Sequence, residues 1–268
     1  MGGRWSLEHL CDGTLGTDVR KISWAPTSTY NPSSDSNITL LTLSSDHAAR
    51  IIEFPSEGGT QLNVLGGTSG HHSFINAIDS IIHPRATVPS TNHDLVIATA
   101  GDDNTLIVWQ WEETSDEETV GLVPAAYALS SAGVAVEFCR HVPKRLIVAE
   151  EEGTIRLLDW AVGSEARVSS PSGVGSGATL WLLNVHMGVG LSFGTDGLLV
   201  NAEWCGDDVD GQTGRIVAVT KGGEWAVWDL SRIEGGARTV PIEQGQVVRA
   251  KNVVAIRYTL SLLQVGMN

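Results

Sequence analysis

The segment IATAGDDNTLIVWQW (Ile97–Trp111) consists of two β-rich runs joined by the short polar turn GDDN. The same pattern occurs in LTLSSDHAARIIEF (Leu41–Phe54), LIVAEEEGTIRLLDW (Leu146–Trp160) and IVAVTKGGEWAVWDL (Ile216–Leu230). The turns SSDH, GDDN, EEEG and TKGG contain residue types that tolerate the left-handed backbone of tight hairpins. We therefore expect each of the four segments to form a β-hairpin.

The hairpins recur at intervals that are typical of a repeat protein. The bulky residues Ile52, Trp109, Leu158 and Trp228 fall in the same register, at intervals of 57, 49 and 70 residues. Blade-type repeats run about 40–45 residues. The excess length falls in insertions rich in Ser, Pro, Gly or acidic residues, at Thr27–Asn37, Arg85–Asp94, Glu112–Thr119 and Gly163–Gly177.

A further strand candidate precedes each hairpin. These candidates are VRKISWAP (Val19–Pro26), INAIDSIIHP (Ile75–Pro84), VAVEFCRHVP (Val134–Pro143) and LLVNAEWCGD (Leu198–Asp207). Short strands repeated with turn signals, with almost no helical periodicity, predict an all-β propeller with four recognisable blades. We expect the blades at residues 17–56, 70–112, 132–161 and 197–232, after an N-terminal segment, 1–16. The atypical tail, 233–268, is expected to contribute an incomplete blade.

Charge, cysteine content and the lack of targeting signals limit the partners and the cellular compartment that we expect. Thirty-one acidic residues against seventeen basic ones give a net charge of −14, which repels phosphate backbones and disfavours direct nucleic-acid binding. The three cysteines, Cys11, Cys139 and Cys205, are odd in number and lack CxxC spacing, as expected in a reducing compartment. The N-terminus lacks a secretion signal, and the most apolar window, Gly177–Phe193, is too polar to span a membrane.

The motifs that would indicate catalysis or metal binding are missing or incomplete. His71, His72 and Asp103 do not form a convincing metal site, because adjacent residues of a strand point to opposite sides. The segment GDDVDG (Gly206–Gly211) lacks acids at the flanking positions of a calcium loop. The glycine clusters at 173–177 and 188–190 lack the phosphate-binding lysine, and GxSxG and HExxH do not occur. We expect no catalytic residue, no metal and no cofactor.

The second unit resembles a WD40 repeat. It contains Gly70-His71 before its first strand, followed by Thr99, Asp103 and Trp109. In WD40 repeats the corresponding histidine, hydroxyl, aspartate and tryptophan form a hydrogen-bonded chain, so the resemblance implies that role here. Such a chain matters because a buried indole or imidazole without a partner costs about 1–3 kcal/mol. The other units are degenerate: Trp228-Asp229 keeps the eponymous dipeptide, and Leu158-Asp159 keeps only its acid.

The order of the units is similar to that of the small WD-repeat nucleoporins of the Y-shaped nuclear pore scaffold. The likeness runs from Thr17 to Arg232 and includes GHHSFINAI (Gly70–Ile78), NAEWC and WAVWDLSR. It implies a seven-bladed, non-enzymatic propeller in the nucleus, at the pore. It also implies a large propeller-plus-helix nucleoporin as partner and a bridge to a chromatin-linked nucleoporin. No repeat is recognisable before Thr17 or after Arg232, so we expect a chain truncated at both ends.

A generic WD40 adaptor that presents peptides or substrates within another complex is the alternative hypothesis. A propeller centre lined by basic and aromatic groups would favour it. The sequence does not define the docking surface. Trp24 and Trp204, near strand ends, are candidates either for the core or for partner anchors, since tryptophan is enriched in interface hot spots.

Overall fold

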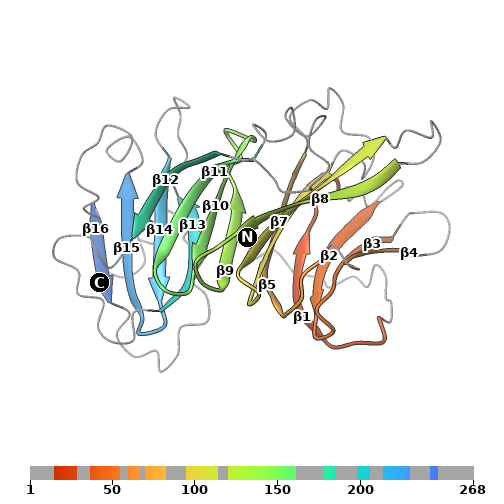
Figure 1. The fold of residues 1–268 in the computed structure, drawn as a ribbon, viewed down its shortest axis with the longest axis horizontal. Helices are drawn as coiled ribbons and strands as arrows, with labels where there is room; N and C mark the ends of the chain where they lie inside the picture. Colours follow the sequence, from red (N-terminus) through yellow and green to blue (C-terminus); the bar gives the residue numbers. More distant parts are fainter. Residues whose placement is uncertain are drawn as a thin grey trace, which may run out of the picture.

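The computed structural model describes residues 15–28, 37–54, 60–66, 70–82, 95–113, 120–160, 178–184, 198–205, 214–229 and 242–246. In these residues, sixteen strands form four antiparallel sheets of four strands each. Consecutive sheets lie side by side, from the red-orange first sheet to the blue fourth sheet (Figure 1). The all-β fold with WD40-type blades, predicted from the sequence, is confirmed.

Strands adjacent in sequence are adjacent in every sheet. The first sheet contains β1 (Val19–Trp24), β2 (Ile38–Ser44), β3 (Ala49–Phe54) and β4 (Gln61–Leu65). The second contains β5 (Ile75–Ile82), β6 (Leu95–Gly101), β7 (Thr105–Glu113) and β8 (Val120–Ala128). The third contains β9 (Gly133–Phe138), β10 (Arg145–Glu150), β11 (Thr154–Asp159) and β12 (Ala178–Asn184). The fourth contains β13 (Leu199–Cys205), β14 (Arg215–Thr220), β15 (Glu224–Asp229) and β16 (Glu243–Gln246).

The hairpins and the strand before each of them lie where the sequence predicts. The last strand of each sheet falls outside the expected blade ranges, and β16 lies in the 233–268 segment, paired with β15. Most of the four expected insertions, and the first fourteen residues, lie outside the described part of the chain.

The four hairpin turns have a common backbone conformation. His47, Asn104, Gly153 and Gly223 each occupy the fourth position of a turn, with φ of 63°, 56°, 97° and 85°. Positive φ is favourable for glycine and tolerated by asparagine and histidine, which explains the residue types found there. Because the turns match, residues of different sheets can be compared position by position through their strand pairing.

Three hydrophobic clusters fill the spaces between consecutive sheets. Leu41 and Ile51 of the first sheet pack with Ile97 and Trp109 of the second. A second cluster joins the second and third sheets, and a third joins the third and fourth sheets. Burying each such side chain stabilises the fold by about 1.5–3 kcal/mol. The sheets are therefore held together mainly by the apolar surface that they bury on one another.

Candidate functional site

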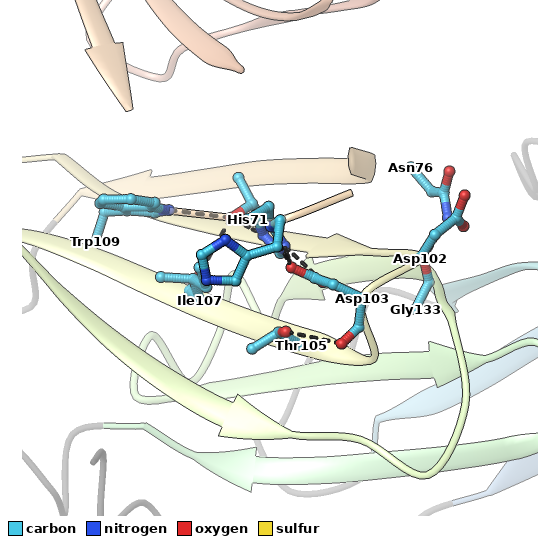
Figure 2. Close-up of polar contacts among 10 residues, drawn as sticks. His71, Asn76, Asp102, Asp103, Thr105, Ile107, Trp109 and Gly133 are labelled. Atoms are coloured by element: carbon cyan, nitrogen blue, oxygen red, sulfur yellow. Dashed lines mark hydrogen bonds and ion pairs between the residues drawn. The ribbon is translucent and has the colours of Figure 1, made fainter. Parts of the chain in front are cut away.

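A hydrogen-bonded chain crosses the second sheet (Figure 2). His71 Nδ1 lies 2.9 Å from Asp103 Oδ1, and His71 Nε2 lies 2.9 Å from Thr99 Oγ1. Trp109 Nε1 donates to the same hydroxyl at 3.0 Å. The structure thus brings together the four residues that the WD40 resemblance singles out, from the loop before β5, from β6, from the β6–β7 turn and from β7.

The charge of Asp103 determines where the proton lies in the hydrogen bond between His71 and Asp103. Burial raises the pKa of its carboxyl, but hydrogen bonds from the His71 side chain, from the backbone N–H of His72 and from Thr105 outweigh this effect and lower it. An ionised carboxylate only accepts hydrogen bonds, so Nδ1 of His71 carries the proton. The other ring nitrogen, Nε2, lies against the hydroxyl of Thr99. The His71 side chain is 0% exposed, so it holds the blade together and is inaccessible to a substrate.

Asn76, held by the other acid of the same turn, connects the second sheet to the third. Asn76 donates its side-chain N–H groups to Asp102 Oδ1 and to the backbone oxygen of Gly133, the latter at 3.1 Å. A Cβ at Gly133 would lie 2.6 Å from the Cβ of Ala100. Glycine at this position therefore permits the close approach of the two sheets.

The hydrogen-bonded chain has no full counterpart in the other sheets. Ala218 in β14 occupies the position of Thr99, and the buried Nε1 of Trp228 has no hydrogen-bond partner in the described part of the chain. In the first sheet the situation is reversed: Thr42 supplies the hydroxyl, but Ile52 stands in place of the tryptophan, and Thr42 Oγ1 lacks a partner there. Each orphaned group costs about 1–3 kcal/mol.

The remaining signature residues end the third strands of the last two sheets. Asp159 ends β11 opposite Arg145, and Asp229 ends β15 opposite Arg215. Opposite charges at directly facing positions stabilise a strand pair by about 0.2–1 kcal/mol. These residues therefore lie apart from the His71 chain, in the third and fourth sheets.

The third sheet has a different polar network, centred on Glu150. This side chain is fully buried, and its Oε2 accepts the backbone N–H groups of Ser130 and Ser131, the latter at 3.0 Å. Its Oε1 accepts from Nε of Arg156. From the sequence, Glu150 is expected only as a turn residue. A carboxylate at the end of an apolar run, with an arginine two positions into the next strand, is the signal that would have indicated this pair.

A repeated contact links the strands that begin the second, third and fourth sheets. Asp79 of β5 accepts the backbone N–H of Phe138 in β9 at 2.8 Å. Glu137 of β9 accepts the backbone N–H of Trp204 in β13 at 2.6 Å. Strand pairing places Asp79 and Glu137 at equivalent positions, and likewise Phe138 and Trp204. We call these two contacts the inner-strand clamps.

Each clamp has additional partners. Arg140 donates to Asp79 Oδ1 at 2.7 Å and to the backbone oxygen of Ser80 at 2.6 Å. Trp204 Nε1 donates to the backbone oxygen of Glu137 at 3.3 Å. Trp204 is thus part of the contact between sheets, whereas Trp24 is 61% exposed. The structure therefore gives Trp204 the core role, and a partner-anchor role for Trp24 stays a prediction.

The clamps adjoin a cavity of about 760 Å³ lined by β1, β5, β9 and β13. Its charged and aromatic lining consists of Arg20, Lys21, Trp24, Asp79, Glu137, Arg140 and Glu203. Burial raises the pKa of Asp79 despite the nearby Arg140. For Glu137, burial together with the negative charges of Asp79 and Glu203 raises the pKa to about 8, against the opposing effect of the Trp204 N–H.

The described residues contain no group of three or more His, Cys, Asp or Glu side chains that could hold a metal ion. In the same part of the chain, no helix is long and apolar enough to cross a membrane. Cys139 is a buried free thiol. The segment Gly206–Gly211, the two glycine clusters and Cys11 lie outside the described residues.

No protein-family model matches the chain. An uncharacterized WD repeat-containing protein of Schizosaccharomyces pombe is 37% identical over 241 residues, which cover 84% of this chain and 58% of that protein. Nucleoporin Nup37 is 27% identical in Mus musculus, over 85% of this chain and 55% of Nup37, and 26% identical in Homo sapiens, over 81% and 52%.

The chain spans about half the length of the curated relatives it matches. The matched part nevertheless covers more than four-fifths of the chain itself. In blade architecture and in sequence, the chain is therefore similar to WD repeat proteins, with a more distant likeness to Nup37.

Proposed function

We propose that this chain is a non-enzymatic scaffold subunit of the nuclear pore complex. It binds other nucleoporins at the nuclear envelope, and this binding supports pore assembly and the transport of protein and mRNA. The likeness to Nup37 over 85% of the chain is the observation that carries this proposal. The partner that this likeness favours is the large propeller-plus-helix nucleoporin of the Y-shaped complex, with a chromatin-linked nucleoporin as a further contact.

The contacts made by the buried polar side chains support a scaffold role. Among the described residues, the buried carboxylates and the imidazole that could serve in catalysis are engaged in structural contacts. His71 is bonded through both ring nitrogens, Glu150 binds an arginine and two backbone N–H groups, and Asp79 and Glu137 hold neighbouring sheets. Buried networks of this kind rigidify a core and specify one geometry.

Localisation and co-purification test the proposal. The full chain, carrying a fluorescent tag and expressed at native level, is expected at the nuclear rim and in the eluate of an affinity-purified Y-complex nucleoporin. The tag alone is the control and is expected in neither place. A chain that stays diffuse in the nucleus and cytoplasm, and is missing from the eluate, would contradict the proposal.

The cavity favours a second candidate, an adaptor that holds a peptide. Its lining combines the ring of Trp24 with three basic side chains (Arg20, Lys21, Arg140) and three acidic ones (Asp79, Glu137, Glu203), so it suits a peptide that carries both charges. Titration with an array of peptides of mixed charge separates the two functions. Saturable binding that Lys21→Glu abolishes would support the adaptor, and its absence would leave the scaffold role as the sole candidate.

A further inference from the structure

Trp24 occupies the position in the first sheet that the N–H donors of the two inner-strand clamps, Phe138 and Trp204, occupy in the third and fourth sheets. Each of the three residues pairs with the residue seven positions before the positive-φ residue of its hairpin turn. Phe138 and Trp204 donate their backbone N–H groups to a carboxylate of the preceding sheet. Trp24 is therefore the position at which one more clamp would attach.

The backbone N–H of Trp24 points away from its own sheet. Ala25 N donates to Thr39 O at 3.0 Å, and the residues of an antiparallel pair alternate between hydrogen-bonded and non-hydrogen-bonded positions, so the N–H of Trp24 is turned away from β2. The third sheet has the same arrangement, in which Cys139 binds the neighbouring strand and Phe138, just before it, binds the clamp acid. No carboxylate in the described part of the chain accepts the N–H of Trp24.

The side chain of Trp24 is exposed, whereas that of Trp204 is used in a contact. Trp24 is 61% exposed, and Ile22, on the same side of β1, is 59% exposed. Trp204 packs against the cluster between the third and fourth sheets, and its Nε1 donates to the backbone oxygen of Glu137 at 3.3 Å. Tryptophan is enriched in interface hot spots. The first sheet thus presents the same two donor groups with which Trp204 holds the strand in front of it.

The two clamps also define the kind of strand that fits this position. Each clamp acid, Asp79 or Glu137, follows a buried alanine by two positions, Ala77 or Ala135. Residues two apart in a strand share a face, and the two alanines belong to the clusters between sheets. The small side chain therefore lies beside the acid on the side that packs against the following sheet. A matching strand contains the sequence Ala-x-Asp or Ala-x-Glu.

The sequence of this chain directs the search for such a strand to another protein. Segments outside the described residues contain neither Ala-x-Asp nor Ala-x-Glu. In the described part, the acids of the two clamps are already engaged within the chain. Glu203, at the equivalent position of β13, follows Asn201 instead of an alanine and accepts a hydrogen bond from it at 2.8 Å.

The charge of β1 suits an incoming carboxylate. The strands β5, β9 and β13 each have an acid at one equivalent position, whereas β1 has Ser23 there. β1 also contains Arg20 and Lys21 and no acidic residue. In a chain with a net charge of −14, β1 is therefore a strand on which a further carboxylate meets positive charge.

We propose that β1 binds a β-strand of a partner protein that contains Ala-x-Asp or Ala-x-Glu. The partner's carboxylate accepts the backbone N–H of Trp24, and a backbone oxygen of the same strand accepts the indole N–H. Apolar side chains of the partner cover Ile22 and the ring of Trp24. Ile38 and Ile52, farther out on the same sheet, are already buried, so the contact follows β1.

Titration of the ¹⁵N-labelled full chain with a synthetic peptide, followed by NMR, tests the proposal. The peptide copies residues 131–140, SAGVAVEFCR, with serine in place of Cys139. The backbone and indole signals of Trp24 are expected to shift saturably, with a dissociation constant below about 1 mM. The same peptide with Glu137→Gln should bind at least about fivefold more weakly, because a hydrogen bond to a carboxylate is about twice as strong as one to a neutral acceptor.

Two variants of the full chain form a matched pair. Trp24→Pro removes the N–H and is expected to abolish binding. It should keep the fold, which far-UV circular dichroism checks, because proline is tolerated where a strand's N–H faces away from the sheet. Trp24→Phe keeps the N–H and is expected to bind like the wild type, since Phe138 fills the equivalent position of a clamp.

Three results would overturn the proposal. The first is a peptide that leaves the Trp24 signals of the wild type unmoved at about 2 mM, well above the expected dissociation constant. The second is equal affinity of the wild type for the Glu and Gln peptides, a comparison that needs no variant of the chain. The third is binding that persists in Trp24→Pro. The titration contains no nucleoporin, so its outcome is separate from that of the localisation test.

Discussion

Replacing Glu137 by glutamine should stabilise the protein at neutral pH. In the native state burial, with Asp79 and Glu203 nearby, raises the pKa of Glu137 from 4.5 to about 8. A raised folded-state pKa means that the stability associated with this group is fully present below the unfolded value, and is lost as pH rises through the folded value. Glutamine has no charge to bury, and its Oε1 can still accept the N–H of Trp204.

The size of the effect follows from the shift. One pKa unit corresponds to about 1.4 kcal/mol, so between pH 4.5 and pH 7 the ionisable side chain costs up to about 3 kcal/mol of unfolding free energy. Glu137 is only partly buried in the folded chain. Solvent around it relaxes the penalty, and we expect a gain of about 1–3 kcal/mol for Glu137→Gln at pH 7.

Urea denaturation at pH 5, 6, 7 and 8, at one protein concentration, measures the difference. The advantage of Glu137→Gln should be small at pH 5 and should grow up to pH 8. Glu152→Gln is the control, because the side chain of Glu152 is exposed in the β10–β11 turn, and it should follow the wild type at every pH. A Glu137→Gln variant that is less stable than the wild type at pH 7, or a difference that does not depend on pH, would refute the reasoning.

Three further substitutions test the polar networks, each by urea denaturation at pH 7. Thr99→Val should destabilise the protein by about 2–4 kcal/mol, because it orphans two buried groups, whereas the matched Thr42→Val, which removes a buried hydroxyl without a described partner, should stabilise it by about 1–3 kcal/mol; equal losses would contradict the hydrogen-bonded chain. Ala218→Thr should stabilise it by about 1 kcal/mol by giving the buried indole of the fourth sheet an acceptor, and no gain would mean that the new hydroxyl does not reach the indole. Glu150→Leu should lower the free energy of unfolding by about 3–5 kcal/mol, because it leaves the charged Arg156 without its carboxylate partner. A loss below 1 kcal/mol would show that the Glu150 network does not stabilise the third sheet.

The hairpins can be predicted from the sequence because their signals are local. Gly153 and Gly223 lie in turns between apolar runs, and positive φ occurs at those residues. The last strand of each sheet has no comparable signal. β16, with the sequence EQGQ, has no apolar alternation, and its conformation is set by pairing with β15.

The polar contacts of the candidate site also differ in whether the sequence predicts them. The contact between His71 and Asp103 follows from a motif whose residue types are diagnostic. The inner-strand clamps do not, because Asp79 and Phe138 are 59 positions apart and one partner is a backbone N–H, which every residue except proline possesses. The exposure of a side chain also depends on residues far away in the sequence. Trp24 and Trp204 lie near the ends of similar strands, but only Trp204 has a described sheet packed in front of it.

The inner-strand clamps leave one of their two positions free to vary. Because each carboxylate binds main chain, the residue that supplies the N–H can change identity without loss of the bond. The two clamps already differ in this way, with phenylalanine at one and tryptophan at the other. At these two junctions the acid is therefore the constrained partner, and the spacing of the inner strands can persist while the residue that faces it drifts.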